Sequence, residues 1–239
     1  MESQFLLFIY FALVMTPPIV FATIFVRLDM FREPILPVVL TLIIGFAATS
    51  MFAEIKYGIL DIPQAWYDDH FINTLFLIAL PEELTKFFVI YFYCAKLHEF
   101  NEPMDGIVYG SLAGLGFAIN EALFYAKSYQ EESETTFEVI DSILMRGLTA
   151  VPGHALDGII MGAFLGYAMF RKVNLTLFIL LAITVPTIFH FLWDYSIFTG
   201  YGEFVYLIFF IQIIIATILF KKFRKLQSKK IIEIEQRIN

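Results

Sequence analysis

The sequence has little charge and almost no cysteine. Only 16% of its 239 residues are Asp, Glu, Lys or Arg, and Cys94 is its one cysteine. A single cysteine excludes an intramolecular disulfide and a cysteine-based metal cluster. Because Cys94 lies in an apolar aromatic run with no base nearby, we interpret it as a packing residue rather than a catalytic thiol. The chain also lacks a Gly-, Ser- or Pro-rich linker, which favours a single domain over residues 1–239.

Apolar residues fill most of the sequence instead. They make up 59% of it, against roughly 45–50% in a soluble domain, and the mean hydropathy is +0.75. Lipid is therefore the expected solvent, and we predict an all-α, polytopic transmembrane bundle of about seven helices. The expected spans are 5–26, 35–53, 71–96, 105–127, 142–170, 174–198 and 203–223. Pro152 and Gly153 are expected to divide the fifth stretch into an initial segment near 137–150 and a span near 153–170.

Basic residues lie mostly on one side of these spans. Alternate connections and the C-terminal tail carry 12 of the 16 Lys and Arg residues, namely Arg27, Arg32, Lys96, Arg171, Lys172, Lys221, Lys222, Arg224, Lys225, Lys229, Lys230 and Arg237. Because cytoplasmic loops are enriched in Lys and Arg, this pattern predicts the N-terminus outside and a cytoplasmic C-terminus with a basic tail, 221–239. The first stretch lacks the features of a cleaved signal peptide, so it is expected to stay as a span. We expect a multi-pass protein of a bacterial cell membrane, surrounded by the lipid bilayer, with no nucleic-acid partner.

Several ionisable residues lie inside the predicted spans. A charge at mid-bilayer depth costs at least ~2.5–3.5 kcal/mol. The chain nevertheless places there Glu82, Glu83, Lys86, Glu121, Asp157 and Asp194, with His154 and His190 beside them. So many costly groups imply a polar, partly hydrated cavity within the bundle.

Helical spacing groups some of these residues. Glu82 and Glu83 lie four and three residues before Lys86, which places them on one helix face with it. His190 and Asp194 are four apart, a spacing that suits two ligands of one metal or a histidine oriented by a carboxylate. Glu121 has no basic residue at helical spacing, so its partner is expected to come from another helix.

Two spans carry glycine at every fourth position. The six residues are Gly106, Gly110 and Gly114 in one span and Gly158, Gly162 and Gly166 in the other. Such faces let helix backbones approach closely in lipid. Because these two spans also carry Glu121 and His154, close packing is expected to bring both side chains toward a common centre. At ~1.5 Å of rise per residue, the ionisable groups of four spans can occupy one layer.

These motifs together resemble the PrsW family of membrane proteases. The resemblance rests on Glu82-Glu83-Leu84-Thr85-Lys86 and on the segments 105–121, 146–154 and 190–194, and it covers roughly 70–198, the predicted core. The family is similar in turn to the CAAX prenyl protease and Abi superfamily. This chain departs from that superfamily by having Glu121 in place of a histidine and a lysine one residue earlier than its arginine. The resemblance implies proteolysis of a single-span membrane protein, such as an anti-sigma factor, near the outer membrane surface.

We therefore expect one membrane-embedded protease domain that acts as an intramembrane endopeptidase. The candidate catalytic residues are Glu82, Glu83, Lys86, Glu121, His154, His190 and Asp194. A glutamate of the 82–83 pair, with Glu121, would activate a water molecule. The two histidines would stabilise the oxyanion or bind a metal that does so. Asp194 would orient His190, and Lys86 would hold the carboxylate pair ionised.

The need for a metal is left open by the sequence. The candidate ligands are Glu121, His154, His190 and Asp194, and the ion would be zinc, which favours histidine and carboxylate ligands. The chain has no His-Glu-x-x-His signature, so a metal-free glutamate mechanism stands beside it. Two other functions use the same residue types: a proton-coupled transporter or channel, and a haem protein ligated by the two histidines. The sequence shows no internal repeat of the transporter kind, which favours the protease.

Overall fold

The computed structural model describes residues 2–133, 135–171 and 173–238, and the side chains of 4–133, 135–171 and 173–229. Lys172 of the predicted charge pattern lies outside the described residues, as do the side chains of Lys230 and Arg237. Helices make up the described elements, with no strand among them, so the all-α prediction is confirmed.

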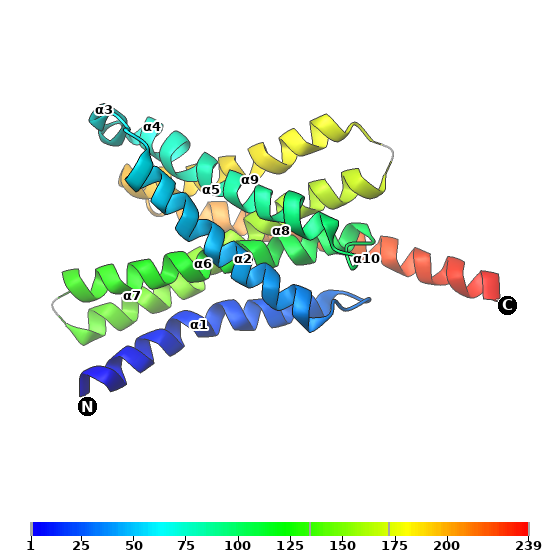
Figure 1. Ribbon diagram of the computed structural model, residues 1–239, viewed down its shortest axis with the longest axis horizontal. Helices are drawn as coiled ribbons and strands as arrows, with labels where there is room; N and C mark the ends of the chain where they lie inside the picture. Colours follow the sequence, from blue (N-terminus) through cyan, green and yellow to red (C-terminus); the bar gives the residue numbers. More distant parts are fainter. Residues whose placement is uncertain (1, 134, 172, 239) are drawn as a thin grey trace.

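The helices follow one another with short connections (Figure 1). Before the central helix the chain forms α1 (Glu2–Leu28), α2 (Ile35–Glu54), η1 (Ile55–Ile59), α3 (Gln64–Asp68), α4 (His70–Ile72), η2 (Asn73–Ala79), α5 (Leu80–Phe88), η3 (Val89–Tyr93) and η4 (Cys94–Lys96). It continues with α6 (Pro103–Glu132), α7 (Thr136–Leu148), α8 (Ala150–Phe170), α9 (Leu175–Phe198) and α10 (Phe204–Ile238). The fifth stretch is divided as expected, but the break lies at Thr149, and Pro152 and Gly153, which were expected to mark it, lie in the first turn of α8.

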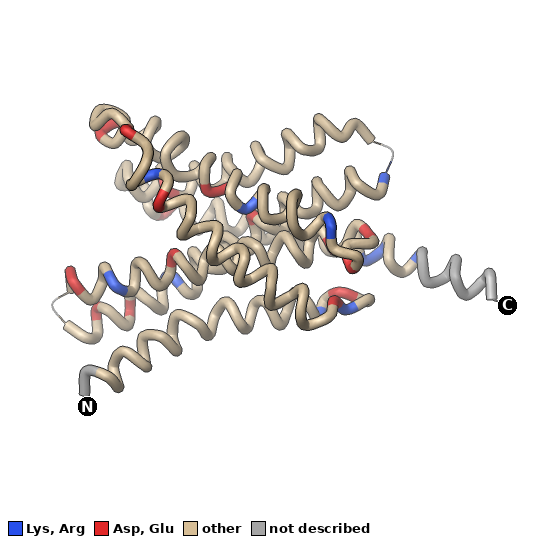
Figure 2. Tube along the Cα trace, viewed as in Figure 1, with Lys and Arg blue, Asp and Glu red and all other residues tan. Residues whose placement is uncertain are grey.

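Among the described residues, six helical segments are long and apolar enough to cross a membrane. They are Gln4–Leu28, Ile35–Ile59, Pro103–Glu132, Thr136–Phe170, Leu175–Phe198 and Phe204–Lys229. The remaining expected span, 71–96, corresponds to the helical segment 70–96, which mixes α-helical and π-helical turns and carries Glu82, Glu83 and Lys86. Its crossing, and the orientation of the two termini, stay predictions. Figure 2 shows charged residues gathered toward the two ends of the bundle, with a small group near its middle.

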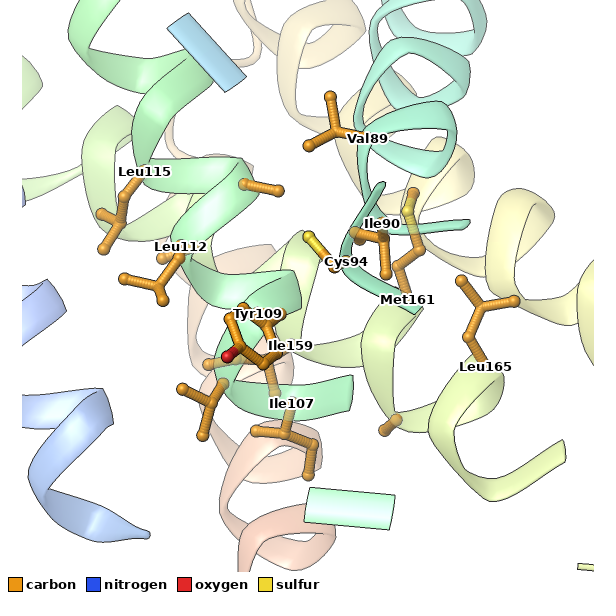
Figure 3. Packing of buried hydrophobic residues seen from close by; sticks show 14 of the residues in the cluster. Val89, Ile90, Cys94, Ile107, Tyr109, Leu112, Leu115, Ile159, Met161 and Leu165 are labelled. Carbon is orange, nitrogen blue, oxygen red and sulfur yellow. The ribbon is translucent and has the colours of Figure 1, made fainter. Parts of the chain in front are cut away.

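The core forms around α6, which packs most closely against α8. Every residue of α6 from Met104 to Ile119 is buried. Apolar side chains of both helices, among them Leu112 and Ile159, surround the fully buried Cys94, as expected of a packing residue (Figure 3). The burial of this helix on all sides makes it the fixed element against which the site is built.

The glycine faces meet as predicted from their spacing. A Cβ atom at Gly162 would lie 1.8 Å from the carbonyl oxygen of Gly106, and one at Gly110 would lie 2.1 Å from that of Gly158. Farther along, a Cβ at Gly114 would lie 2.2 Å from the carbonyl oxygen of His154. The α6 backbone therefore lies directly on the α8 backbone at His154, which is how the two helices hold their polar residues at one level.

Candidate active site

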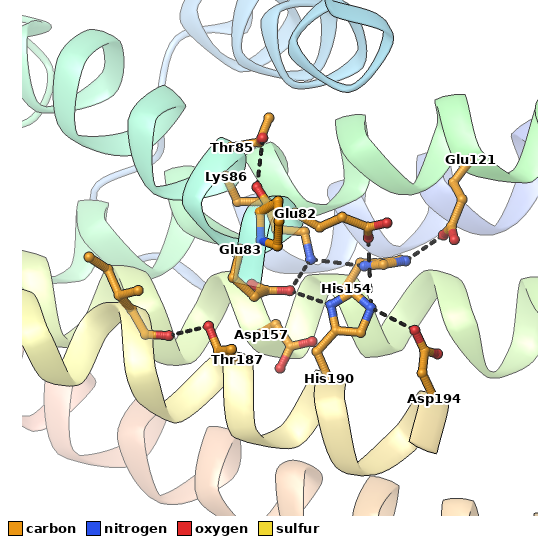
Figure 4. A network of polar contacts seen from close by, with 12 residues as sticks. Glu82, Glu83, Thr85, Lys86, Glu121, His154, Asp157, Thr187, His190 and Asp194 are labelled. Carbon is orange, nitrogen blue, oxygen red and sulfur yellow. Dashed lines mark hydrogen bonds and ion pairs between the residues drawn. The ribbon is translucent and has the colours of Figure 1, made fainter. Parts of the chain in front are cut away.

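The seven predicted site residues lie in one connected polar network (Figure 4). They come from four helices: α5 carries Glu82, Glu83 and Lys86, α6 carries Glu121, α8 carries His154, and α9 carries His190 and Asp194. The convergence expected from the sequence is therefore present in the structure.

A buried ion pair forms the base of the network. Lys86 Nζ lies 2.5 Å from Glu83 Oε1, and neither side chain is exposed to solvent. The same ammonium group lies 2.9 Å from His154 Nδ1, and because an ammonium has no lone pair, Lys86 donates and this nitrogen accepts. Glu83 Oε1 also lies 2.7 Å from His190 Nδ1. Lys86 and Glu83 thus fix the Nδ1 atoms of both imidazoles.

The Nε2 atoms of the two imidazoles face other carboxylates. His154 Nε2 lies 2.6 Å from Glu121 Oε2, and His190 Nε2 lies 3.3 Å from Asp194 Oδ2 and 3.7 Å from Glu82 Oε2. The rings themselves lie close together, with centroids 5.4 Å apart. Each histidine therefore has one nitrogen held by the buried pair and the other turned toward an acidic group.

Glu121 has its partners on other helices, as its isolation on α6 predicted. Arg146, at the end of α7, places its guanidinium 2.9 Å from Glu121 Oε2. The same guanidinium lies over the Tyr125 ring at 3.8 Å, a cation–π geometry that fixes its position. The break between α7 and α8 brings Arg146 and His154 to the same carboxylate.

Two polar residues extend the network beyond the predicted set. Asp157, one turn after His154 on α8, is buried and accepts a hydrogen bond at 2.8 Å from Gln212 of α10. One potential ligand atom each from Asp157, Glu83 and the two histidines lie within 4.8 Å of one another. Asp157 had a sequence signal, since it is an acid within a span. There was less reason in the sequence to single out Gln212, which is a lone amide in an apolar run.

A cavity of about 590 Å³ exposes one side of this network. Its wall includes Glu82, Glu121, His154, His190 and Asp194. Toward the end of the bundle it is also lined by exposed residues of three other segments, Tyr57, Asp141 and Gly202. The Nε2 side of both histidines therefore belongs to a polar space that reaches the protein surface, whereas Lys86 and Glu83 are fully buried.

Replacing Lys86 by methionine is expected to destabilise the protein by about 3–5 kcal/mol, because it leaves the Glu83 carboxylate buried without its cation. The double variant Lys86→Met, Glu83→Gln should recover most of that loss, since neither charge then remains. Thermal unfolding in detergent, monitored through dye labelling of the buried Cys94 thiol, measures the stability of both variants. Equal destabilisation in the single and double variants would contradict the ion pair's role.

Comparisons with known proteins match the chain to one family. A family model described as PrsW family intramembrane metalloprotease matches residues 33–218. Protease PrsW of Oceanobacillus iheyensis is 36% identical over 168 residues, 69% of this chain and 73% of that protein. Protease PrsW of Halalkalibacterium halodurans is 30% identical over 157 residues (66% and 68%), and that of Bacillus subtilis 28% over 176 residues (73% and 75%). No solved structure matches the chain.

Proposed function

The chain belongs to the PrsW family of intramembrane metalloproteases and is a multi-pass bacterial membrane protease, and we propose that it cuts a single-span membrane protein near the outer membrane surface. The substrate would be of the anti-sigma-factor kind. The observation that carries this proposal is the cavity, whose wall combines two histidines and five carboxylates and reaches the surface of the bundle. Family membership also favours proteolysis over the transporter and haem alternatives.

The residues on the cavity side fit a zinc ion. Glu83 holds Nδ1 of His190, which leaves Nε2 to face the cavity. A zinc-binding histidine usually has a carboxylate on the ring nitrogen that does not bind the metal, as Glu83 is placed on Nδ1 of His190. The opposite, Nδ1 side of the network already has a cation, the Lys86 ammonium between Glu83 and His154. We therefore assign the metal to the Nε2 side of the histidines rather than to the group that includes Glu83, which the Lys86 ammonium already occupies.

The residues that would hold the ion are His154 and His190, through Nε2, with Glu121 and Asp194, the carboxylates nearest to those nitrogens. Because His154 Nδ1 accepts from Lys86, its Nε2 carries the ring proton in this structure, and the Lys86–His154 pair would have to release one proton for Nε2 to bind zinc. Two histidines with carboxylate oxygens form a usual catalytic zinc set. When bound, zinc would act as a Lewis acid that polarises the scissile carbonyl.

Glu82 is the residue best placed to move protons. Its Oε2 atom is buried without a hydrogen-bond partner among the described residues, and the side chain lines the cavity. It would accept a proton from the attacking water as the C–O bond forms, and would pass that proton to the amine as the C–N bond breaks. Arg146 holds Glu121 in place, and Lys86 holds the orientation of His154.

Substrate cleavage can be tested by co-expression with a panel of single-span membrane proteins, each tagged at both ends. At least one is expected to be cut near the outer end of its span by the wild type. Glu82→Gln, which keeps the shape of the side chain but cannot accept the proton, should lower this cutting by about 10²–10⁴-fold. Glu131→Gln, at an exposed glutamate far along α6, is the matched control. Cutting that persists in Glu82→Gln would contradict the role of Glu82.

Metal removal is expected to abolish cleavage reversibly. Purified enzyme treated with a strong chelator should lose at least about 99% of its activity, and stoichiometric zinc should restore it, because two of its ligands are imidazoles. Glu121→Gln should need at least about 10–100-fold more zinc for binding, the cost of losing a residue that only supports a ligand, as measured by equilibrium dialysis. Unchanged cleavage after metal removal verified by elemental analysis would instead support the metal-free glutamate mechanism.

A further inference from the structure

A second group of buried carboxylates lies at the other end of α6. Asp29 and Glu33 come from the connection between α1 and α2, and Glu102 and Asp105 from the start of α6. Each of the four is at most 9% exposed. Asp105 and Glu121 are 16 residues apart on one helix, so about 24 Å of helix separates this group from the active site. The group therefore needs an explanation of its own.

The charge of three members, Asp29, Glu33 and Asp105, is not balanced by a basic side chain of the described part of the chain. No Lys or Arg there forms an ion pair with Asp29, Glu33 or Asp105. Neutral donors hold one oxygen of each instead. The donors are the Phe31 N–H to Asp29 (3.0 Å), the Tyr109 hydroxyl to Glu33 (2.6 Å), and the Asn101 and Glu102 N–H groups to Asp105 (2.6 and 2.8 Å). A buried charge without a counter-charge costs several kcal/mol, so the arrangement calls for a positive partner.

A glutamine from a distant helix also points into the group. Gln227 of α10 is 2% exposed, and its amide nitrogen donates to Asp29 Oδ1 at 2.5 Å and to Glu102. Its Oε1 atom and the Asp29 Oδ2 atom are both buried and have no hydrogen-bond partner among the described residues. Both atoms are acceptors. What they lack is therefore a donor or a cation.

The spacing of the oxygens suits a metal ion. One carboxylate oxygen each from Asp29, Glu33 and Asp105 lie within 4.8 Å of one another. A cation that binds oxygen at about 2.0–2.6 Å can contact all three at once. Because the group offers oxygen and no histidine or cysteine ligand among the described residues, it fits a hard cation rather than zinc.

We propose that this group binds a divalent cation of the Mg²⁺ or Ca²⁺ kind, which fastens α10 to the connection between α1 and α2. The ion balances the three carboxylates, and the Gln227 amide links the same group to the extended end of α10.

The test compares thermal unfolding of the full-length protein with and without added ions. At pH 8, saturating Mg²⁺ or Ca²⁺ should raise the unfolding midpoint of the wild type by about 5 °C or more. The double variant Asp29→Asn, Glu33→Gln should lose this response and, without added ion, should be at least as stable as the wild type, because its repulsion is relieved. Asp61→Asn, at an exposed acid, should respond like the wild type. Sodium chloride at equal ionic strength controls for screening.

A second readout follows the end of α10 directly. Trypsin should cut the tail at Lys221, Lys222, Arg224 and Lys225 more slowly when the ion is present. In Gln227→Leu the midpoint should still respond to the ion, while the tail loses its protection. The proposal is overturned if the wild type shows no ion response, if the double variant responds as the wild type does, or if acidification to pH 6 stabilises the wild type with no ion dependence.

Discussion

Alanine in place of His190 is expected to lower kcat/KM for cleavage of a membrane substrate at least ~1,000-fold. His190 is the residue where the network joins, because its ring contacts Glu83 through Nδ1 and both Asp194 and Glu82 through Nε2. The substitution removes a proposed metal ligand, and it also removes the imidazole beside Glu82, the proposed general base. Single groups of this kind contribute about 10²–10⁴-fold each. The measurement is cleavage in reconstituted vesicles, quantified from the two product fragments.

Two further variants separate chemistry from folding. His190→Gln keeps an amide that can donate to Glu83, so it should insert and fold while cleavage stays low. His98→Ala makes the same change at an exposed histidine outside the network and should cut at the wild-type rate. Cleavage by His190→Ala within tenfold of the wild type would contradict the placement of His190 at the reacting atoms.

The convergence of the site could be predicted because each of its members is costly in lipid. A membrane helix tolerates Glu121 or Asp194 only where polar partners or water offset the cost of burying the charge. Four helices that carry such groups are therefore expected to share a cavity. The glycine faces gave a second, geometric reason, because Gly114 brings α6 onto the backbone of His154. Both arguments use residue type and spacing alone, and both agree with the structure.

The pairings at helical spacing, Glu83 with Lys86 and His190 with Asp194, could be predicted, but those between helices could not. The contact between Lys86 and His154 joins residues 68 apart, and that between Arg146 and Glu121 depends on the helix break at Thr149. Such contacts follow from the rotation of each helix about its axis, which packing sets and spacing does not reveal. The same reason explains why Gln212 had no assigned role.

The segment 70–96 shows the limit of hydropathy. Its apolar residues predicted a span, yet Glu82, Glu83 and Lys86 weigh against insertion of this segment alone. In the structure it packs against α2 and α9, and its charged residues pair with each other and with the histidines. Its stability in the membrane thus depends on helices that follow later in the chain.

Alanine in place of Gly162 is expected to destabilise the protein by about 3 kcal/mol or more. The added Cβ would lie 1.8 Å from the Gly106 carbonyl oxygen and 2.6 Å from its carbonyl carbon. These are backbone atoms of a helix that is buried on all sides, so the clash cannot be relieved by a rotamer change. The two helices must separate, and the contact of Glu121 with His154 weakens with them. Labelling of the Cys94 thiol during heating measures the loss.

Gly153→Ala is the matched control on the same helix, because nothing lies within 4 Å of the Cβ it would add. It should be neutral or stabilising by up to ~1 kcal/mol, since alanine is the better helix former. A large loss in Gly162→Ala and none in Gly153→Ala assigns the effect to the helix contact rather than to glycine as such. If both variants unfold together with the wild type, α6 and α8 are not held by backbone contact, and the alignment of Glu121 with His154 needs another cause.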